Sequence, residues 1–484
     1  MRSAENLLAP RVANLLAISL IVVSGLYIFR WVVGPDTTFY MDDWVWIRQA
    51  IFSNWSDFLT VWTLLPARLF HDRPVESAIF KLLYQVFELD FTGYAITSLG
   101  IHIANAVLVY WLAARLLSSK FYGMIAGILF VIDYCVAYPA WWASTVADSA
   151  SLFFCLCAFL SFLSPRRIWS AGATVLFYYL AVKSKETALP FPLILLAYSF
   201  LDKITSARGS DLAKALRSAL RLTWPVMLAF AVYTGFALYY FVGAWKSGMK
   251  GYGPYAPQFD WQTFVDGVRV YLGYVAFELI TPNQALIAFG ILIVVAVATF
   301  NRAAILGAIG FFVSTAEALF LATHRMEYFA YAASAYIALM LAALVQRVDI
   351  RLAAKLGSVA DFAAKASVLF AVMWFTYHVY SVGLYREHML ANLRETSRAL
   401  KTLPSALSQV KEQSKIVVTG LPPATNLFSS GPCFAVGVVF KVRDMDCRID
   451  GSDTELLGVY ERLAGPKILL HYDRGNVSLR ARSP

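Results

Sequence analysis

Apolar segments long enough to cross a lipid bilayer recur from Arg11 almost to Arg386, and they constrain the fold more than any other feature. A transmembrane helix needs about 20 mostly apolar residues to cross the hydrocarbon core. The chain of 484 residues is 59% hydrophobic and only 15% charged, with a mean hydropathy of +0.60, which is far more apolar than a soluble domain. The sequence therefore predicts an α-helical polytopic membrane protein.

The positive charges of the chain are spread over the short loops between these segments. The formal net charge is +10, which in a soluble protein would suggest a nucleic-acid partner. Here Lys and Arg gather in loops such as 202–221, and loops of this kind stay on the cytoplasmic side of a membrane. The charge therefore indicates topology, and we expect no nucleic-acid partner.

The first apolar segment follows the basic residues Arg2 and Arg11, and no small-residue cleavage site comes after it. We expect that this first span is retained and runs outward. The chain should have about eleven transmembrane helices, the first included, and its C-terminus should then lie outside. The predicted spans are 11–33, 94–117, 121–138, 146–163, a fifth that ends at Lys183, 187–201, 224–245, 285–300, 303–322, 329–345 and 367–385.

The segment 264–280 is ambiguous, since it is apolar but carries three charges. As a span it would place the loop at 324–325 in the cytoplasm, and as a re-entrant or interfacial helix it leaves that loop outside. We favour the second interpretation, because Asp266, Arg269 and Glu278 would be costly in hydrocarbon.

Residues 34–90 form the predicted first outer loop of a transmembrane domain that covers residues 1–386. The loop is too charged to span the bilayer, but it carries several tryptophans, including Trp44 and Trp55. Aromatic residues of this kind settle at the membrane surface. We therefore expect interfacial amphipathic helices in this loop.

The last hundred residues, 387–484, are polar enough for water and predict a small extracytoplasmic α/β domain. Within it, 415–420 has the composition of a strand that enters a turn. Cys433 and Cys447 lie in this tail and could form a disulfide in an oxidising compartment. The alternative is two unpaired thiols. Cys135, Cys155 and Cys157, in apolar spans, are expected to be core residues.

The stretch from Tyr40 to Trp44 places two carboxylates, Asp42 and Asp43, directly after the first span. Charged groups beside an apolar span are costly unless they have a task, so this pair is a candidate reaction centre. The alternative is that the two acids cap the helix expected from Trp44 onward, as acidic residues do at helix starts.

Ionisable residues also occur inside the predicted spans, where each must face protein or water. All lie in the outward half of their spans, on the same side as Asp72 and Glu186, which suggests a common cavity. The residues are Asp133, Asp148, Glu317 and His378. Taken singly, each is also explained by a hydrogen bond between helices, and the same alternative applies to His102 and Asn105.

The sequence contains no P-loop, GxSxG, HExxH or paired CxxC motif, so nucleotide-driven and hydrolase chemistry have no support. Carboxylates and cations on one face suit the transfer of a sugar. A carboxylate can take the proton from an acceptor hydroxyl, and cations can hold a departing lipid phosphate.

The order of these residues resembles the GT-C class of membrane glycosyltransferases, particularly the protein O-mannosyltransferases, the aminoarabinose transferases and the TMTC-type enzymes. The pair Asp42-Asp43 matches the acidic pair in the first outer loop of that class, and 72–75 is similar to its acidic/basic-Pro-Pro-apolar element. The stretches 142–148 and 184–190 resemble the TMTC group. The resemblance covers roughly the first 200 residues.

The resemblance implies a polyprenyl-phosphate-linked monosaccharide as donor, a glycan, lipid or protein as acceptor, and inversion at the anomeric carbon. Asp42 would be the general base, with Asp43 as its orienter or a metal ligand, and Arg73 would meet the donor phosphate. In this chain Val75 replaces the second proline, and His71 precedes the acid.

The remaining candidate residues lie on the same predicted face. Those for the donor phosphate are Lys185, His324 and Arg325. Those for acceptor contacts or support of the site are Asp72, Glu186, Asp148 and Glu317. The resemblance implies no certain cofactor, and it leaves open a divalent metal ion, which some members of the class use.

Two other classes of function compete with this interpretation. A transporter or flippase of lipid-linked sugars would place its site near the midplane, between repeated halves; the sequence has no internal repeat, and its charges gather at one face. A membrane-anchored binding or assembly protein would use the tail instead. The expected location is the bacterial inner membrane, with the active site and C-terminus facing the periplasm or exterior.

Overall fold

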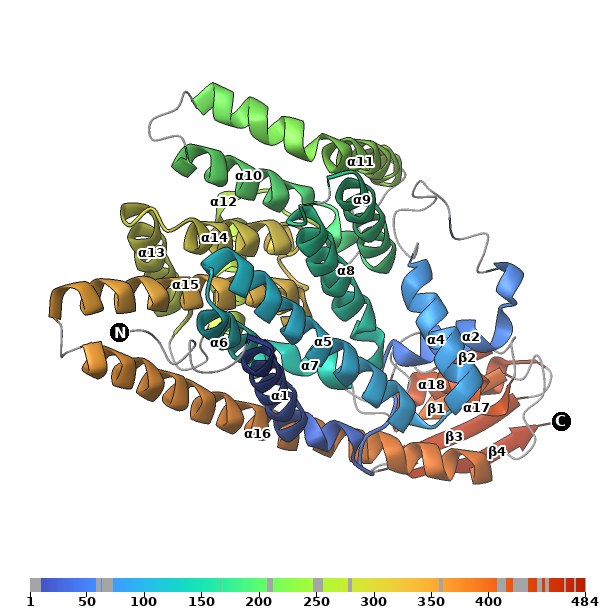
Figure 1. The fold of residues 1–484 in the computed structure, drawn as a ribbon. Helices are drawn as coiled ribbons and strands as arrows, with labels where there is room; N and C mark the ends of the chain where they lie inside the picture. The colour runs from blue at the N-terminus through green and yellow to red at the C-terminus, as the bar shows by residue number, and fades with distance from the viewer. Residues whose placement is uncertain are drawn as a thin grey trace.

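The structure, a computed structural model, is an array of long helices with a small β-sheet at one end (Figure 1). It describes residues 10–57, 62, 73–165, 167–206, 212–246, 256–276, 281–356, 360–406, 415–420, 434–441, 446–448, 452–464, 467–473 and 476–483.

A helix stands at the position of each predicted crossing. These helices are α1 (Pro10–Phe29), α5 (Phe91–Leu117), α6 (Lys120–Val131), α8 (Val146–Phe162), α9 (Arg167–Ser184), α10 (Pro192–Ser206), α11 (Leu212–Lys246), α13 (Pro282–Ala298), α14 (Arg302–Thr315), α15 (Tyr331–Leu356) and α16 (Ala360–Ala406). Six described segments are long and apolar enough to cross a membrane, namely Arg11–Val33, Phe91–Leu117, Ala143–Phe162, Glu186–Ile204, Leu212–Tyr239 and Glu327–Arg351. The fold is that of an integral membrane protein, and the count of eleven crossings stays a prediction.

Local sequence signals begin and end several of these helices. Asp90 caps α5 by accepting a hydrogen bond from the backbone N–H of Thr92 at 2.9 Å, and Thr281 forms a capping box with Gln284 at the start of α13. Ser118 ends α5 in the left-handed conformation, with a φ of 52°. Polar caps of this type satisfy the free N–H groups that every helix start presents.

Glycines allow the helices to pack closely in the core. A Cβ at Gly123 would lie 2.7 Å from the Cβ of Ala114, so α6 approaches α5 more closely than a larger residue would permit. A Cβ at Gly307 would lie 2.6 Å from the carbonyl oxygen of Tyr336, which brings α14 against α15. Small residues at helix contacts are typical of membrane proteins.

The expected helices of the first outer loop are α2 (Asp43–Phe52) and α4 (Pro74–Phe87), joined to α1 through the short helix η2 (Arg30–Val33). Nζ of Lys81 on α4 donates to the carbonyl oxygens of Ala50 and Ser53 at 2.5 and 2.7 Å, which fastens α4 to the end of α2. Pro74 is the first residue of α4, a position that favours proline because its missing N–H needs no partner there.

Short helices join the long ones on the side of α2 and α4. They are η3 (Tyr134–Val136), α7 (Ala137–Trp141), η4 (Ala143–Thr145), η5 (Glu186–Ala188), η8 (Ala318–Phe320) and η9 (Glu327–Ala330). The ambiguous segment forms α12 (Trp261–Ala276), which contacts η3, η8 and η9. This packing supports the interfacial interpretation of α12, which stays a prediction.

The tail folds as a four-stranded sheet with two helices. The strands are β1 (Lys415–Thr419), β2 (Asp446–Arg448), β3 (Lys467–Asp473) and β4 (Asn476–Ser483), and the helices are α17 (Phe434–Phe440) and α18 (Asp453–Arg462). The strand order is β2-β1-β3-β4; β1 pairs parallel with β2 and β3, and β3 pairs antiparallel with β4. The strand predicted at 415–420 is therefore present as β1.

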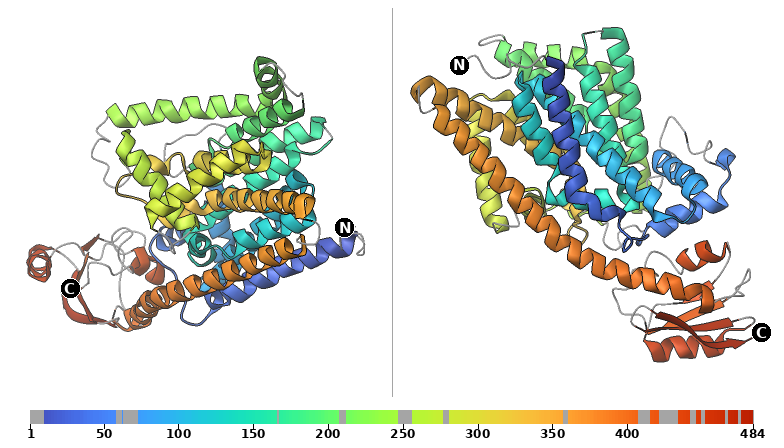
Figure 2. Two further views of the ribbon diagram at one scale, coloured as in Figure 1. Left: turned by 90° about the vertical axis from the view of Figure 1, so that its left-hand side faces the viewer. Right: turned by 60° about the horizontal axis from the view of Figure 1, so that its bottom comes forward.

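The tail lies on the same side of the molecule as α2 and α4 (Figure 2). The long helix α16 carries the chain to the sheet and contacts β4, and α17 contacts α2. The predicted domain boundary after residue 386 falls inside α16, and the division into domains stays a prediction. Cys433 and the side chain of Cys447 lie outside the described residues.

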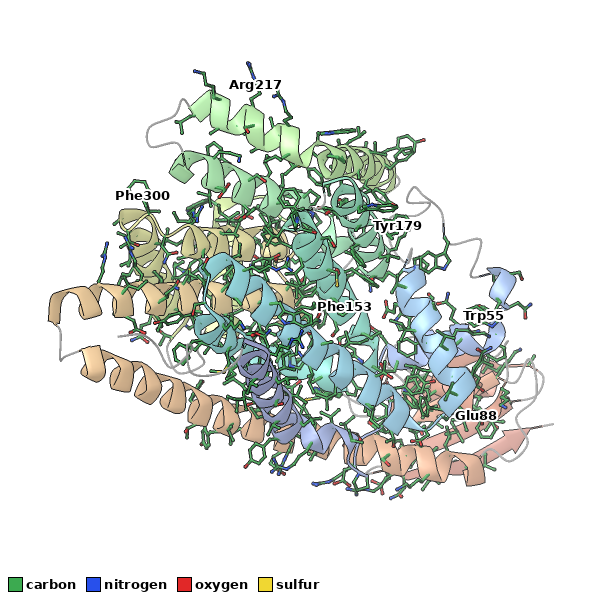
Figure 3. All side chains as sticks on the ribbon, viewed as in Figure 1. Trp55, Glu88, Phe153, Tyr179, Arg217 and Phe300 are labelled. Atoms are coloured by element: carbon green, nitrogen blue, oxygen red, sulfur yellow. The ribbon has the colours of Figure 1, made fainter. Side chains whose placement is uncertain are left out.

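The other end of the molecule carries the basic loop that predicts the cytoplasmic side. Figure 3 shows Arg217 of α11 far from Trp55 and Glu88, which lie near α2 and α4. Cys135 and Cys155 are buried and Cys157 is half-buried against the core, which confirms that they are core residues, and all three thiols are free.

Candidate active site

The acidic pair has one exposed and one buried member. Asp43 is 0% exposed, and its two carboxylate oxygens accept backbone N–H groups from Tyr40 at 2.9 Å and from Ser144 at 2.6 Å. Asp42 is exposed and makes no side-chain capping bond to α2, so the helix-capping interpretation is wrong for this residue. Met41 between Tyr40 and Asp42 has a φ of 43°, a strained conformation for a residue with a side chain. Asp43 thus fixes a tight turn that presents Asp42 to solvent.

Burial raises the pKa of Asp43 to about 8, although its two backbone hydrogen bonds favour the ionised form. Burial also raises the pKa of Tyr40 to about 12, with a further contribution from Asp43. The buried acid therefore holds the turn, and Asp42 beside it stays exposed.

Aromatic rings connect this turn to the other side of the site. The indole Nε1 of Trp142 donates to the carbonyl oxygen of Tyr40 at 3.0 Å, and the rings of Trp141 and Trp142 pack edge-on against that of Tyr40. The ring of Trp142 also packs against Tyr328, with centroids 5.9 Å apart. These contacts bring η9 beside the acidic pair.

Arg73 makes a two-point ion pair with Glu186. Its Nε donates to Oε2 of Glu186 at 3.0 Å and its Nη2 to Oε1 at 2.5 Å. The side chains of this pair are 23% and 31% exposed, so a ligand can reach them. Nη1 of Arg73 lies 3.6 Å from Oε2 of Glu76, which is 0% exposed. Neither oxygen of Glu76 has a hydrogen-bond partner among the described residues.

Lys185 makes a buried ion pair with Asp148. Its Nζ donates to both carboxylate oxygens at 2.7 Å, and the two side chains are only 5% and 7% exposed. The same Nζ lies 4.6 Å from the ring centroid of Tyr328 and 5.1 Å from that of Phe329, as in cation–π contacts. Lys185 is therefore held more tightly than Arg73 and is less accessible to a ligand.

His324 and Glu317 lie within the electrostatic range of these ion pairs, and His324 also lies within that of Asp42. Burial lowers the pKa of His324, Lys185 lowers it further, and Asp42 raises it, so Asp42 and Lys185 act on the same imidazole. Nε2 of His324 lies 3.0 Å from the hydroxyl of Tyr328. Glu317 is exposed and interacts electrostatically with the ion pairs. Together these side chains form what we call the polar cluster: Asp42, Arg73, Glu76, Asp148, Lys185, Glu186, Glu317 and His324.

Other candidates have structural partners elsewhere. Arg325 donates to the carbonyl oxygens of Leu321 and Thr263 at 2.9 and 3.2 Å, and so ties its loop to α12. Asp133 accepts the backbone N–H of Cys135 at 3.1 Å. His71, Asp72 and the side chain of His378 lie outside the described residues.

His102 and Asn105 make the hydrogen bonds between helices that their positions predict. Nδ1 of His102 and Nδ2 of Asn105 both lie within 3.1 Å of the hydroxyl of Tyr331, and Nδ2 of Asn105 also donates to the carbonyl oxygen of Ser149. These contacts join α5 to α8 and α15, so the two residues support the fold.

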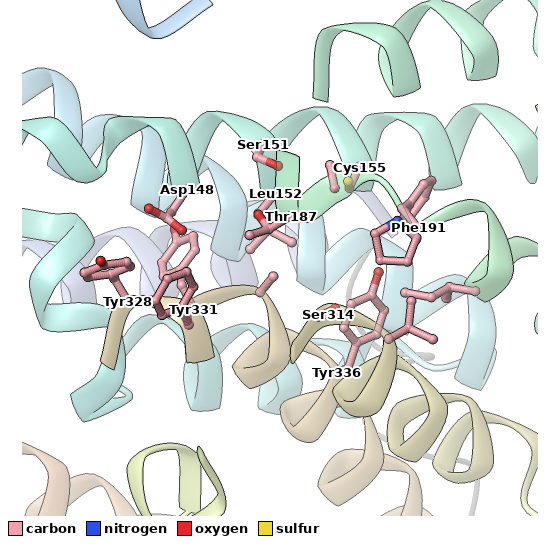
Figure 4. Close-up of a pocket in the computed structure, with 16 residues that line it drawn as sticks. Asp148, Ser151, Leu152, Cys155, Thr187, Phe191, Ser314, Tyr328, Tyr331 and Tyr336 are labelled. Carbon is pink, nitrogen blue, oxygen red and sulfur yellow. The ribbon is translucent and has the colours of Figure 1, made fainter. Parts of the chain in front are cut away.

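A small internal cavity of about 30 Å³ lies beneath the polar cluster, between α8, α10, α14 and α15. Figure 4 shows Asp148 and Tyr328 at one end of it and Ser314 and Tyr336 at the other. Its volume is enough for one or two water molecules, not for a sugar.

In the described part of the chain, no group of three or more His, Cys, Asp or Glu side chains is arranged to hold a metal ion. Both carboxylate oxygens of Asp43 already accept backbone N–H groups. The described residues therefore do not fit a divalent metal site.

Two residues of the site could not be recognised in the sequence. Glu76 is an acid in the first turn of α4, like many helix starts, and its full burial depends on the contacts of α4 with α8 and α9. Tyr328 is one aromatic among many in apolar spans. The one signal for Glu76 is its spacing of three residues from Arg73, which suits an ion pair on a helix.

The burial of Glu76 should make the stability of the protein depend measurably on pH. Burial raises its pKa in the folded protein to about 8 from an ordinary 4.5, so the folded state holds a proton that the unfolded state releases. The free energy of unfolding should therefore fall as the pH rises from about 4.5 to about 8, by up to about 1.4 kcal/mol per pH unit from this group. Glu76→Gln should flatten that slope in thermal unfolding of the purified protein.

The exposed residue Glu88 supplies a matched control, because its side chain lies at the surface on the same side of the molecule. Glu88→Gln should leave the slope unchanged. If Glu76→Gln also left it unchanged, Glu76 would be ionised throughout this range of pH, and its burial would need another charge partner. The pKa of Asp43 is also raised by burial, and Asp43 is present in both variants, so its contribution to the slope is the same in each.

Compared by sequence, the chain matches no family model and no curated protein. Its three-dimensional structure is similar to solved structures. The archaeal oligosaccharyltransferase AglB from Archaeoglobus fulgidus, in complex with an inhibitory peptide and a dolichol-phosphate, aligns with a TM-score of 0.51 and 12% identity over 95% of this chain and 69% of AglB.

ArnT from Cupriavidus metallidurans, bound to undecaprenyl phosphate, aligns with a TM-score of 0.46 and 12% identity over 94% of this chain and 92% of ArnT. At 12% identity, both likenesses concern the fold alone. Of these two structures, AglB has the higher TM-score, and the conclusion about the fold rests on it. The chain therefore has a fold similar to that of AglB, in agreement with the fold that the resemblance in its sequence implies.

Proposed function

We propose that this protein is a membrane glycosyltransferase that moves a monosaccharide from a polyprenyl-phosphate carrier to an acceptor on the extracytoplasmic face. One observation carries the proposal: the exposed carboxylate of Asp42 stands on a turn that the buried Asp43 holds, and His324 lies near enough to feel the charges of both Asp42 and Lys185. The ligand of AglB, a dolichol-phosphate, agrees with a lipid phosphate as the carrier.

Asp42 is the general base of the proposed reaction. It takes the proton from an acceptor hydroxyl as the oxygen attacks the anomeric carbon of the donor. The bond between that carbon and the phosphate oxygen breaks, and the electron pair leaves with the lipid phosphate. Attack from the face opposite the leaving group inverts the configuration at the anomeric carbon.

Arg73 stabilises the negative charge that develops on the departing phosphate. Its guanidinium can meet two phosphate oxygens at once, and its present two-point partner, Glu186, is partly exposed. Lys185 adds positive charge from its buried position beside Asp148. A cation aimed at developing charge lowers the barrier because it is oriented before the reaction.

The transporter and flippase interpretation expects its polar residues near the middle of the bilayer. In this structure Asp148 lies in the first turn of α8, Lys185 directly follows α9, and Glu317 follows α14. Polar residues at helix ends favour transfer at one membrane surface over passage across it.

The proposal is tested by incubating purified protein in liposomes with a set of polyprenyl-phosphate monosaccharides that carry a radioactive sugar, together with membrane glycans, lipids and peptides as acceptors. Release of unlabelled polyprenyl phosphate with label on an acceptor would support it. Movement of intact labelled lipid between leaflets, without release of polyprenyl phosphate, would contradict it in favour of a flippase.

The proposed orientation in a bacterial inner membrane places the polar cluster and the tail in the periplasm. A reporter fused after Pro484 should be active only in an extracytoplasmic assay, such as alkaline phosphatase, and a fusion within loop 207–210 should be active only in a cytoplasmic one. A cytoplasmic signal from the C-terminal fusion would overturn the count of eleven crossings.

A further inference from the structure

A second site lies at the far end of α5 from the polar cluster. It is a groove of about 720 Å³ between α1, the end of α5, the start of α6 and α8, and it is called the cationic groove here. Its lining includes Asn14, Tyr110, Trp111, Arg115, Lys120 and Leu160. The 27 residues of α5 are about 40 Å long, more than the thickness of the hydrocarbon core, so in the proposed orientation the groove is on the opposite side of the membrane from Asp42 and Arg73.

The charge in the groove is positive. Of the residues that line it, Arg115 and Lys120 are cations and none is an acid. The left-handed turn at Ser118, with a φ of 52°, ends α5 and lets α6 begin at Lys120, which brings the two cations to one rim. Nη1 of Arg115 donates to the carbonyl oxygen of Leu160 at 3.2 Å, and this bond orients the guanidinium across α5 and α8.

The groove opens beside surfaces that face the acyl chains of the bilayer. On α1, Leu15 and Leu16 are 64% and 56% exposed, and Trp111 of α5 is 43% exposed. In the lining of the groove, the hydroxyl of Tyr110 donates to Oδ1 of Asn14 at 2.8 Å, so these two groups are already paired. The molecule that fills such a groove in a membrane is a lipid, because lipid tails surround it.

We propose that the cationic groove binds one anionic phospholipid, with its phosphate between Arg115 and Lys120 and an acyl chain along Trp111. Basic pockets between helices at a membrane surface suit acidic head groups, and each cation near such a head group contributes about 1 kcal/mol. A lipid held there bridges α1, α5 and α6 and stabilises their contact. The site is independent of the proposed transfer reaction.

The test is native mass spectrometry of the full-length protein in neutral detergent, titrated with phosphatidylglycerol or with phosphatidylcholine of the same acyl chains. The protein should bind one phosphatidylglycerol tightly, and the double variant Arg115→Gln/Lys120→Gln should bind it about 25-fold more weakly, from about fivefold for each cation. The single variants should each show about fivefold weaker binding, and they answer the question if the double variant does not fold.

The matched control is Lys214→Gln/Arg217→Gln, which removes two exposed cations of α11 that do not line the groove. This control should bind phosphatidylglycerol like the wild type. Equal binding of phosphatidylcholine, or unchanged binding by the Arg115 and Lys120 variants, would overturn the proposal. Displacement of the lipid by millimolar inorganic phosphate would also overturn it, because the occupant would then be a soluble anion.

Discussion

Asp42→Asn is expected to lower the turnover of sugar transfer by about 10²- to 10⁴-fold, the range that a general base contributes. The amide has nearly the shape of the carboxylate but cannot take a proton from the acceptor hydroxyl. Because the Asp42 side chain is exposed and makes no capping bond, the thermal unfolding temperature should not change. Turnover is measured as the rate of transfer with saturating labelled donor. The Kd for the donor is measured in parallel and should stay within about threefold of the wild-type value.

Two further variants separate this effect from damage to the fold. Glu88→Gln removes an exposed acid on the same side of the molecule and should keep full activity. Asp43→Ala should lower both activity and stability, because it leaves the backbone N–H groups of Tyr40 and Ser144 without their carboxylate; each unpaired buried group costs about 1–3 kcal/mol. Wild-type turnover by Asp42→Asn would remove Asp42 from the mechanism.

The contrast between the two aspartates could not be predicted from the sequence. Asp42 and Asp43 are adjacent acids in the chain, and either could have been the buried one. The structure decides it through the left-handed turn at Met41 and the backbone N–H of Ser144, which lies 101 residues further along the chain. Long-range contacts of this type leave no local pattern.

The helices were predictable because their signals are local. Apolar runs, end charges and caps locate the long helices, and the short apolar run at 415–420, which ends in a glycine, locates β1. The pairing of charges was not predictable, since Arg73 meets Glu186 across 113 residues and Lys185 meets Asp148 across 37. Which cation takes which carboxylate depends on how α4, α8 and α9 pack.

That pairing separates two residues which the sequence treats alike as phosphate candidates. Lys185 is enclosed by Asp148 and two aromatic rings, so its replacement should act mainly on folding. Arg73 is partly exposed, and its partner Glu186 is partly exposed too. A lipid phosphate can therefore compete with Glu186 for Arg73 without breaking a buried ion pair.

Arg73→Ala is accordingly expected to weaken the binding of polyprenyl phosphate by about 2–3 kcal/mol, a rise of roughly 30- to 150-fold in Kd. Arg73→Lys should recover only part of the affinity, because an ammonium cannot meet two oxygens in the fixed geometry of a guanidinium. The Kd is measured by titrating purified protein with a radiolabelled polyprenyl phosphate. Arg73→Ala also leaves the carboxylate of Glu186 without its two-point partner, so stability must be measured alongside affinity.

Arg394→Ala is the matched control, since Arg394 also pairs through two nitrogens with a carboxylate, that of Asp36, at 2.9 and 3.0 Å. That pair is 45% and 44% exposed, so its loss should change stability by less than about 1 kcal/mol and leave Kd unchanged. The double variant Arg73→Ala/Glu186→Gln removes the unpaired charge of Glu186 and should regain stability without regaining affinity. An unchanged Kd in Arg73→Ala would show that Arg73 holds the fold and not the phosphate, and the role of the leaving-group cation would then pass to Lys185.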